Sequence, residues 1–141
     1  MTGRIFAITG AFGVLGSAVA KAAADAGARV ALIDFANSAP NGLGEAFVMP
    51  GVDWTDTVAA GAAIDAAATH FGGLDALINV AGGFRWETLE GGDMSNWHAL
   101  YRMNVETAAN ASRAAIPHLR RSRAGRIVNV GANGAVKASA G

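Results

Sequence analysis

The sequence has 141 residues, enough for one domain with a substantial core, and its 52% hydrophobic content argues against a disordered chain. Eleven basic and eleven acidic side chains cancel, so no net charge recruits nucleic acid or an anionic membrane surface. The absence of cysteine excludes disulfides, thiolate metal sites and cysteine nucleophiles, and no apolar run is long enough to span a bilayer; we therefore expect a cytoplasmic protein.

Apolar runs rich in valine and isoleucine alternate with helical stretches along the chain. The runs predict strands at Ile5–Thr9, Arg29–Phe35, Ala46–Met49, Leu74–Val80 and Arg126–Val130, and the stretches between predict helices at Val14–Ala26, Thr55–Phe71 and Asp93–Arg121. Because the strands are mostly apolar on both faces, we expect them to be buried on both sides. The alternation predicts an α/β doubly wound parallel sheet with helices on both faces. Only Ala36 to Glu45 joins the second and third strands, and its Gly, Asn and Pro residues leave room for one helical turn at most.

Three glycines stand where the first strand gives way to the first helix. Gly10, Gly13 and Gly16 are spaced so that backbone amides can approach a diphosphate at a helix N-terminus. Asp34 follows at the end of the second strand, where a carboxylate can accept hydrogen bonds from ribose hydroxyls. This order indicates a dinucleotide site. The alternatives are that the glycines only form tight turns and that Asp34 is a solvated charge at a strand end.

With these residues, the whole chain resembles the short-chain dehydrogenase/reductase family. Thr9–Gly16 is similar to the family's phosphate loop, although Val14 stands where glycine is commonest. Asn79–Gly82 is similar to the family's Asn-Asn-Ala-Gly signature, with valine at its second position. The resemblance implies one NAD-binding Rossmann domain over residues 1–141, with five parallel strands in the order 3-2-1-4-5. It also implies hydride transfer between NAD(H) and a small alcohol or carbonyl substrate. Asp34, with no arginine beside it, resembles the family's NAD-preferring arrangement, since a carboxylate repels a 2′-phosphate.

Two further positions follow from the resemblance. Asp53 looks like the family's adenine-contacting aspartate; because it precedes a predicted helix, an N-cap role is an equal alternative. Asn104 looks like the helix asparagine that holds a water in the family's proton relay, and a bystander asparagine is the alternative.

The candidate site is therefore as follows. We expect cofactor binding by Gly10, Phe12, Gly13, Leu15, Gly16, Asp34, Phe35, Asp53, Trp54, Asn79, Val80, Ala81 and Gly82, and a catalytic contribution from Asn104. No metal is expected, because His70, His98 and His118 are scattered without paired carboxylates and are interpreted as helix-surface residues.

The resemblance breaks at the catalytic residues. Ala132 stands at the family's serine position, and Tyr101, the one tyrosine, is followed four residues later by Val105 where the family has lysine. We do not favour Lys137 or Ser139 as substitutes. Three hypotheses stay open: the N-terminal part of an oxidoreductase, an inactive dinucleotide-binding protein, and a structural or interaction protein. Because the family is commonly oligomeric and the fifth strand lacks an outer neighbour, we expect a homo-oligomer.

Overall fold

The computed structural model describes residues 2–40, 45–135 and 137, and these form one five-stranded parallel sheet. The strands are β1 (Ile5–Thr9), β2 (Arg29–Ile33), β3 (Phe47–Met49), β4 (Ala76–Asn79) and β5 (Arg126–Asn129). Their order is β3-β2-β1-β4-β5, and every neighbouring pair is parallel. The predicted α/β doubly wound sheet is therefore confirmed, with strand ends shifted by one or two residues.

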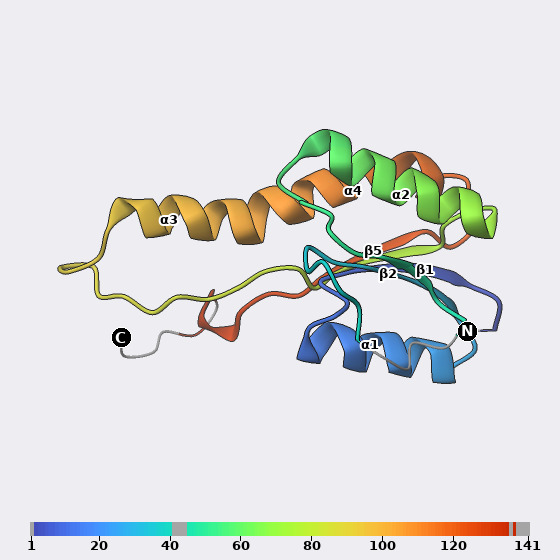
Figure 1. The fold of residues 1–141 in the computed structure, drawn as a ribbon, viewed down its shortest axis with the longest axis horizontal. Coiled ribbons are helices and arrows are strands. Elements are labelled where there is room, and N and C mark those ends of the chain that lie inside the picture. Colours follow the sequence, from blue (N-terminus) through green and yellow to red (C-terminus); the bar gives the residue numbers. More distant parts are fainter. Residues whose placement is uncertain (1, 41–44, 136, 138–141) are drawn as a thin grey trace.

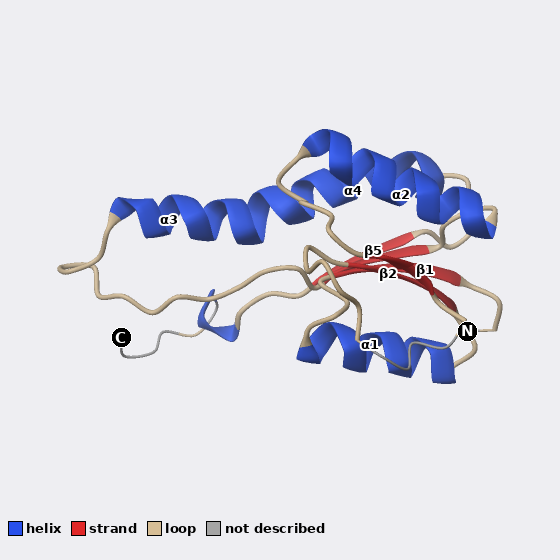
Figure 2. Ribbon diagram, in the orientation of Figure 1, coloured by secondary structure: helices blue, strands red, loops and turns tan. Residues whose placement is uncertain are grey.

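Helices cover both faces of the sheet (Figure 1). Helix α1 (Val14–Asp25) lies on one face, and α2 (Thr57–Phe71) and α4 (Thr107–Leu119) lie side by side on the other. Helix α3 (Met94–Tyr101) continues into α4 through a π-helical turn at Arg102–Glu106 and projects beyond the sheet (Figure 2). A short 3₁₀ turn follows β5 at Asn133–Ala135. The sequence predicted the long helical segment but not the π-helical turn within it.

Small side chains bring the helices close to the sheet. Buried alanines of α2 and α4 face one another across that layer, namely Ala60, Ala63, Ala67, Ala111 and Ala115. On the other face, Ala20 and Ala23 of α1 pack with Ile8 and Leu32 of the central strands. Because alanine is a strong helix former with a minimal side chain, the same residues favour the helices and allow this close packing.

Two details depart from the expected fold. All residues of β5 are exposed, whereas the sequence predicted burial on both sides; β5 is an edge strand, and the described helices leave it largely uncovered. Helix α2 begins at Thr57 rather than Thr55, because Asp56 accepts hydrogen bonds from the N–H groups of Val58 and Ala59 and caps the helix. The connection from β2 to β3 shows no helix in its described part; residues 41–44 lie outside the described residues.

Candidate functional site

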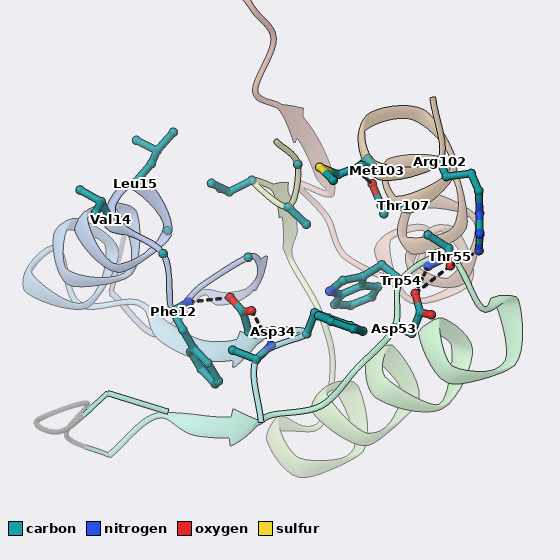
Figure 3. Close-up of a pocket in the computed structure, with 18 of the residues that line it drawn as sticks. Phe12, Val14, Leu15, Asp34, Asp53, Trp54, Thr55, Arg102, Met103 and Thr107 are labelled. Carbon is teal, nitrogen blue, oxygen red and sulfur yellow. Dashed lines mark hydrogen bonds between the residues drawn. The ribbon is translucent and has the colours of Figure 1, made fainter. Parts of the chain in front are cut away.

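A cleft of about 880 Å³ opens beside the carboxyl ends of β1, β2 and β4 (Figure 3). Its lining residues are Gly10, Phe12, Gly13, Val14, Leu15, Gly16, Asp34, Phe35, Ala36, Asp53, Trp54, Thr55, Val80, Ala81, Gly82, Ala99, Arg102, Met103 and Thr107. All residues predicted to bind the cofactor are among them except Asn79. Ligands of doubly wound sheets bind at this edge, at the point where the connections that follow two neighbouring strands run to opposite faces of the sheet. Here β1 is followed by α1 on one face and β4 by α3 and α4, with α4 on the other face.

The three glycines of the first loop have different surroundings. Gly10 has a φ of +63°, and a Cβ atom there would lie 2.7 Å from the backbone nitrogen of Ala81. A Cβ atom on Gly16 would collide with the carbonyl oxygen of Gly10. At Gly13, the nearest atom would be that same oxygen, at 3.5 Å. Close packing inside the loop thus requires that Gly10 and Gly16 have no side chain. At Gly13 a side chain would have space, on the side that faces the cleft.

The N-terminus of α1 faces the cleft without a side-chain cap. Gly13 is the N-cap residue, and no described side chain accepts a hydrogen bond from the first helical amides. Val14 and Leu15, which follow it, line the cleft. The first N–H groups of a helix have no partner within the helix, and the helix dipole adds partial positive charge there. This end of the cleft can therefore hold an anionic group such as a diphosphate.

Asp34 is fixed at the end of β2 by two backbone donors. Its Oδ2 accepts a hydrogen bond from the N–H of Phe12 at 2.8 Å, and its Oδ1 accepts one from the N–H of Ala36 at 2.9 Å. Because each carboxylate oxygen accepts more than one hydrogen bond, both can also accept from vicinal hydroxyl groups in the cleft. The backbone bonds hold the carboxylate in one orientation beside the glycine loop.

Asp53 belongs to a second polar group across the cleft. Its Oδ1 accepts hydrogen bonds from the N–H and the hydroxyl of Thr55, both at 2.8 Å, and Arg102 donates to the Thr55 hydroxyl at 2.8 Å. Hydrogen bonds from the Thr55 hydroxyl and backbone N–H, with the nearby charge of Arg102, hold the pKa of Asp53 below its usual value. The alternative N-cap role for Asp53 is wrong, since Asp56 caps α2. An ionised Asp53 carboxylate can accept a hydrogen bond from an amino group of a ligand.

Asn79 connects elements beside the cleft instead of lining it. Its Nδ2 donates to Asn129 Oδ1 at 2.8 Å and to Ser112 Oγ at 3.2 Å, so it joins β4 to β5 and to α4. Thr9 acts similarly at the neighbouring strand end, where its buried hydroxyl oxygen accepts from the N–H groups of Val80 and Ala81. These bonds set the backbone path of the segment that follows β4.

Asn104 lies in the π-helical turn and lines a second cavity of about 790 Å³, together with Asn79 and Ala132. Its Oδ1 accepts from the N–H of Gly83 at 3.0 Å, while its Nδ2 donates to the carbonyl oxygens of Gly83 and Leu100. The side chain therefore fastens the loop after β4 to the helix. Its contribution to a proton relay stays a prediction.

The remaining candidates are dispersed. Tyr101 is exposed near the end of α3, and Ala132 lies at the rim of the second cavity. Ser139 lies outside the described residues. His70 and His98 are exposed as expected. The His118 side chain is only 14% exposed, and its Nε2 bonds to Asp65, which joins α4 to α2. Within the described ranges, no cluster of His, Asp and Glu could hold a metal ion and no helix is long and apolar enough to cross a membrane.

Sequence reasoning missed part of the cleft wall. Among the lining residues that were not predicted are Thr55, Ala99, Arg102, Met103 and Thr107. Of these, all but Thr55 come from a helical segment that starts more than ten residues after β4. No local spacing marks these residues, because the helical segment reaches the cleft only through its packing against α2 and the sheet.

Comparison with known proteins gives a consistent result. The short chain dehydrogenase family matches residues 4–141. The chain is 34% identical to 2,5-dichloro-2,5-cyclohexadiene-1,4-diol dehydrogenase of Sphingobium indicum over 92% of this chain and 55% of the relative. It is 32% identical to 2,3-dihydro-2,3-dihydroxybenzoate dehydrogenase of Bacillus subtilis, over 94% of this chain and 54% of the relative.

Solved structures show the same fold. A variant of a short-chain dehydrogenase/reductase from Serratia marcescens superposes with a TM-score of 0.86 at 28% identity, over 99% of this chain and 61% of that chain. The chain thus spans little more than half the length of the curated relatives it matches. The matched residues include the glycine loop, Asp34, the segment after β4 and Asn104. The chain therefore belongs to the short-chain dehydrogenase family, and membership implies a nicotinamide dinucleotide cofactor.

Proposed function

We propose that this chain is the cofactor-binding part of an oxidoreductase that transfers hydride between NAD(H) and a small alcohol or carbonyl compound. Within it, residues 1–141 act as one NAD-binding domain. The observation that carries the proposal is the pairing of an uncapped helix N-terminus at Gly13 with a fixed carboxylate at Asp34 across one cleft. The first suits a diphosphate and the second suits ribose hydroxyls.

Other lining residues would contact successive parts of the dinucleotide. Asp53 would accept from the amino group of adenine, and Val80, Ala81 and Gly82 would border the nicotinamide ribose. When bound, the nicotinamide supplies the hydride acceptor or donor. The role of this chain's own side chains is to bind and orient it, with Asn104 positioned to hold a relay water. We propose NAD over NADP, because Asp34 would face a 2′-phosphate with like charge.

A calorimetric titration of the purified chain with NAD and with NADP tests this assignment. We expect saturable binding of NAD and weaker binding of NADP. A folded chain that binds neither dinucleotide would contradict the function, and tighter binding of NADP would contradict the role of Asp34.

A second candidate function is dinucleotide binding without turnover. It is favoured by Ala132, which lies in the second cavity at the position where the resemblance expects serine. A panel of secondary alcohols distinguishes the two functions, and it should include cyclic diols because both relatives are named for such substrates. Absence of dinucleotide binding would instead favour a structural or interaction protein.

A further inference from the structure

Trp54 has a buried polar atom without a partner. The residue is 2% exposed, and its indole Nε1 finds no hydrogen-bond acceptor in the part of the chain that the structure describes. Burial of a donor without an acceptor costs free energy, and buried tryptophans ordinarily place this N–H on a partner. Phenylalanine would fill apolar space at this position without that cost. The unpartnered N–H therefore needs an explanation outside the core packing.

The backbone that carries the indole is anchored to α4, and the ring is packed in the core. Asn110 of α4 donates from Nδ2 to the carbonyl oxygens of Trp54 and Thr55, at 3.0 and 3.3 Å. The ring also packs in the buried cluster beneath α2 and α4, together with Ile33 and Ala111. The carbonyl oxygen of Trp54 thus has a hydrogen-bond partner, whereas its indole nitrogen has none among the described residues.

Trp54 also lines the cleft. In Figure 3 the indole lies between Asp34 and Asp53, with its nitrogen on the side of Asp34. If Asp34 accepts from the ribose and Asp53 from the amino group of adenine, the atoms between them belong to the adenosine half of the dinucleotide. Ring nitrogens of the purine and oxygens of the ribose are hydrogen-bond acceptors there, while both protein carboxylates are acceptors only.

We propose that the Trp54 N–H is a recognition donor that binds an acceptor atom of the adenosine half of the cofactor. The inference rests on the proposed function and adds a donor to the adenosine part of the cleft, where Asp34 and Asp53 are acceptors. The ligand would thereby satisfy a donor that the free protein leaves unpaired. The free-energy cost of burying this donor without a partner on folding is then offset when the donor bonds to the ligand.

The test follows the indole N–H signals of the ¹⁵N-labelled chain by NMR during titration with AMP. Trp→Phe variants at positions 54, 86 and 97 assign the three signals, and Trp86 and Trp97 serve as internal controls because neither lines the cleft. We expect AMP to move the Trp54 proton downfield and to slow its exchange with solvent, while the other two signals stay in place. An unchanged Trp54 signal at saturating AMP would overturn the inference.

Affinity supplies a second measurement. Trp54→Phe should weaken AMP binding about 3- to 10-fold, as for loss of one hydrogen bond, and leave the affinity for inorganic diphosphate unchanged. Equal AMP affinity in the variant and the wild type would overturn the donor role, and so would equal losses for AMP and diphosphate, which indicate a loosened cleft. If the wild-type chain binds neither AMP nor NAD, the proposed function itself fails, an outcome distinct from these.

Discussion

At the scale of single residues, the first loop separates glycines needed by the fold from the glycine available to a ligand. Gly10 combines a positive φ with close contact to Ala81, and Gly16 leaves no space for a Cβ atom against Gly10. Gly13 has ordinary backbone angles, with φ of −72° and ψ of 170°, and free space toward the cleft. Substitutions at these sites should therefore have different consequences for folding and for binding.

Gly13→Val is the variant that tests the loop as a cofactor site. The branched side chain fits the extended backbone but occupies the cleft at the helix N-terminus, so we expect NAD affinity to fall at least about tenfold, or 1.4 kcal/mol, with the melting temperature nearly unchanged. Calorimetry and thermal unfolding measure the two quantities. Gly10→Ala is the control: we expect it to lower the free energy of unfolding by about 2 kcal/mol, because alanine is strained at positive φ. A folded Gly13→Val variant with normal NAD affinity would reduce this glycine to a turn former.

Asp34→Asn tests the cofactor preference with little change of shape. The amide keeps one oxygen as an acceptor for a backbone N–H but removes the charge that would oppose a 2′-phosphate. We expect the ratio of NAD to NADP affinity to fall about tenfold, a modest value because the site is open to solvent. Competition titrations at fixed ionic strength measure the ratio. An unchanged ratio would show that Asp34 does not face the 2′ position.

At the scale of elements, Asp75 joins segments distant in the sequence at the end of the sheet opposite the cleft. It precedes β4; its Oδ2 accepts from the N–H of Ile5 at 2.9 Å, and its Oδ1 accepts from the Ser122 hydroxyl at 2.6 Å. Burial raises the pKa of Asp75, but hydrogen bonds from Ser122 and Ile5, with the charge of Arg4, outweigh it and hold the pKa below its usual value. The charged carboxylate therefore stabilises the start of β1 and the loop before β5.

We expect Asp75→Ala to lower the free energy of unfolding by about 2 kcal/mol at pH 7, corresponding to two hydrogen bonds of about 1 kcal/mol each. Because the folded pKa is depressed, this contribution is fully present above the unfolded pKa of about 4 and is lost as the pH falls through the lower folded value. Urea unfolding of both proteins from pH 7 to pH 2.5 measures the difference. Asp25→Ala is the control, because Asp25 makes only an exposed pair with Lys21. A difference independent of pH would contradict the role of the charge.

At the scale of the whole molecule, the open side of the sheet determines the expected association. β5 is an edge strand, and the apolar side chains of Ile127 and Val128 within it and of Val130 directly after it are exposed. An open strand edge with apolar side chains is a template for pairing with another chain. We expect the 141-residue chain to form a homo-oligomer at micromolar concentration, and Val128→Lys to shift it toward monomer. Light scattering measures both, with Val58→Lys on α2 as a control; a monomeric wild type would contradict the expectation.

Turnover also belongs to this scale, because it depends on groups brought together from several elements. The described residues place Asn104 and Ala132 around the second cavity, and the exposed Tyr101 is absent from its lining. We expect the 141-residue chain to bind NAD with dehydrogenase activity near background, since general acid–base catalysis typically contributes about 10²–10⁴-fold. NADH formation across a panel of secondary alcohols measures it. Robust turnover would show that another group supplies the proton, with Ser139, Lys137 and Tyr101 the first to test.

Local patterns were sufficient to predict the sheet and much of the cleft. The parallel strands and the positions of Gly13 and Asp34 follow from hydrophobic runs and glycine spacing, which operate over short stretches of chain, whereas the strand order was expected from the family resemblance. The missing outer neighbour of β5 was expected, but its apolar pattern wrongly predicted burial on both faces, because a strand's sequence does not say whether helices cover it. The N-cap at Asp56 was missed by three residues, since Asp53 and Asp56 are equally suitable cap residues in sequence.

The sequence by itself determined the parallel α/β architecture, the glycine loop and the acid at the end of β2, because each depends on local backbone geometry and short-range periodicity. Tertiary structure alone decided which side chains of the long helical segment join the cleft wall and how distant side chains pair. Arg102 reaches Thr55 across 47 residues, Asn104 fastens the loop after β4, and Trp54 is buried with its N–H unpaired. These relations depend on how a long helical segment packs against α2 and the sheet, and side-chain contacts between distant segments leave no periodic signal in the chain.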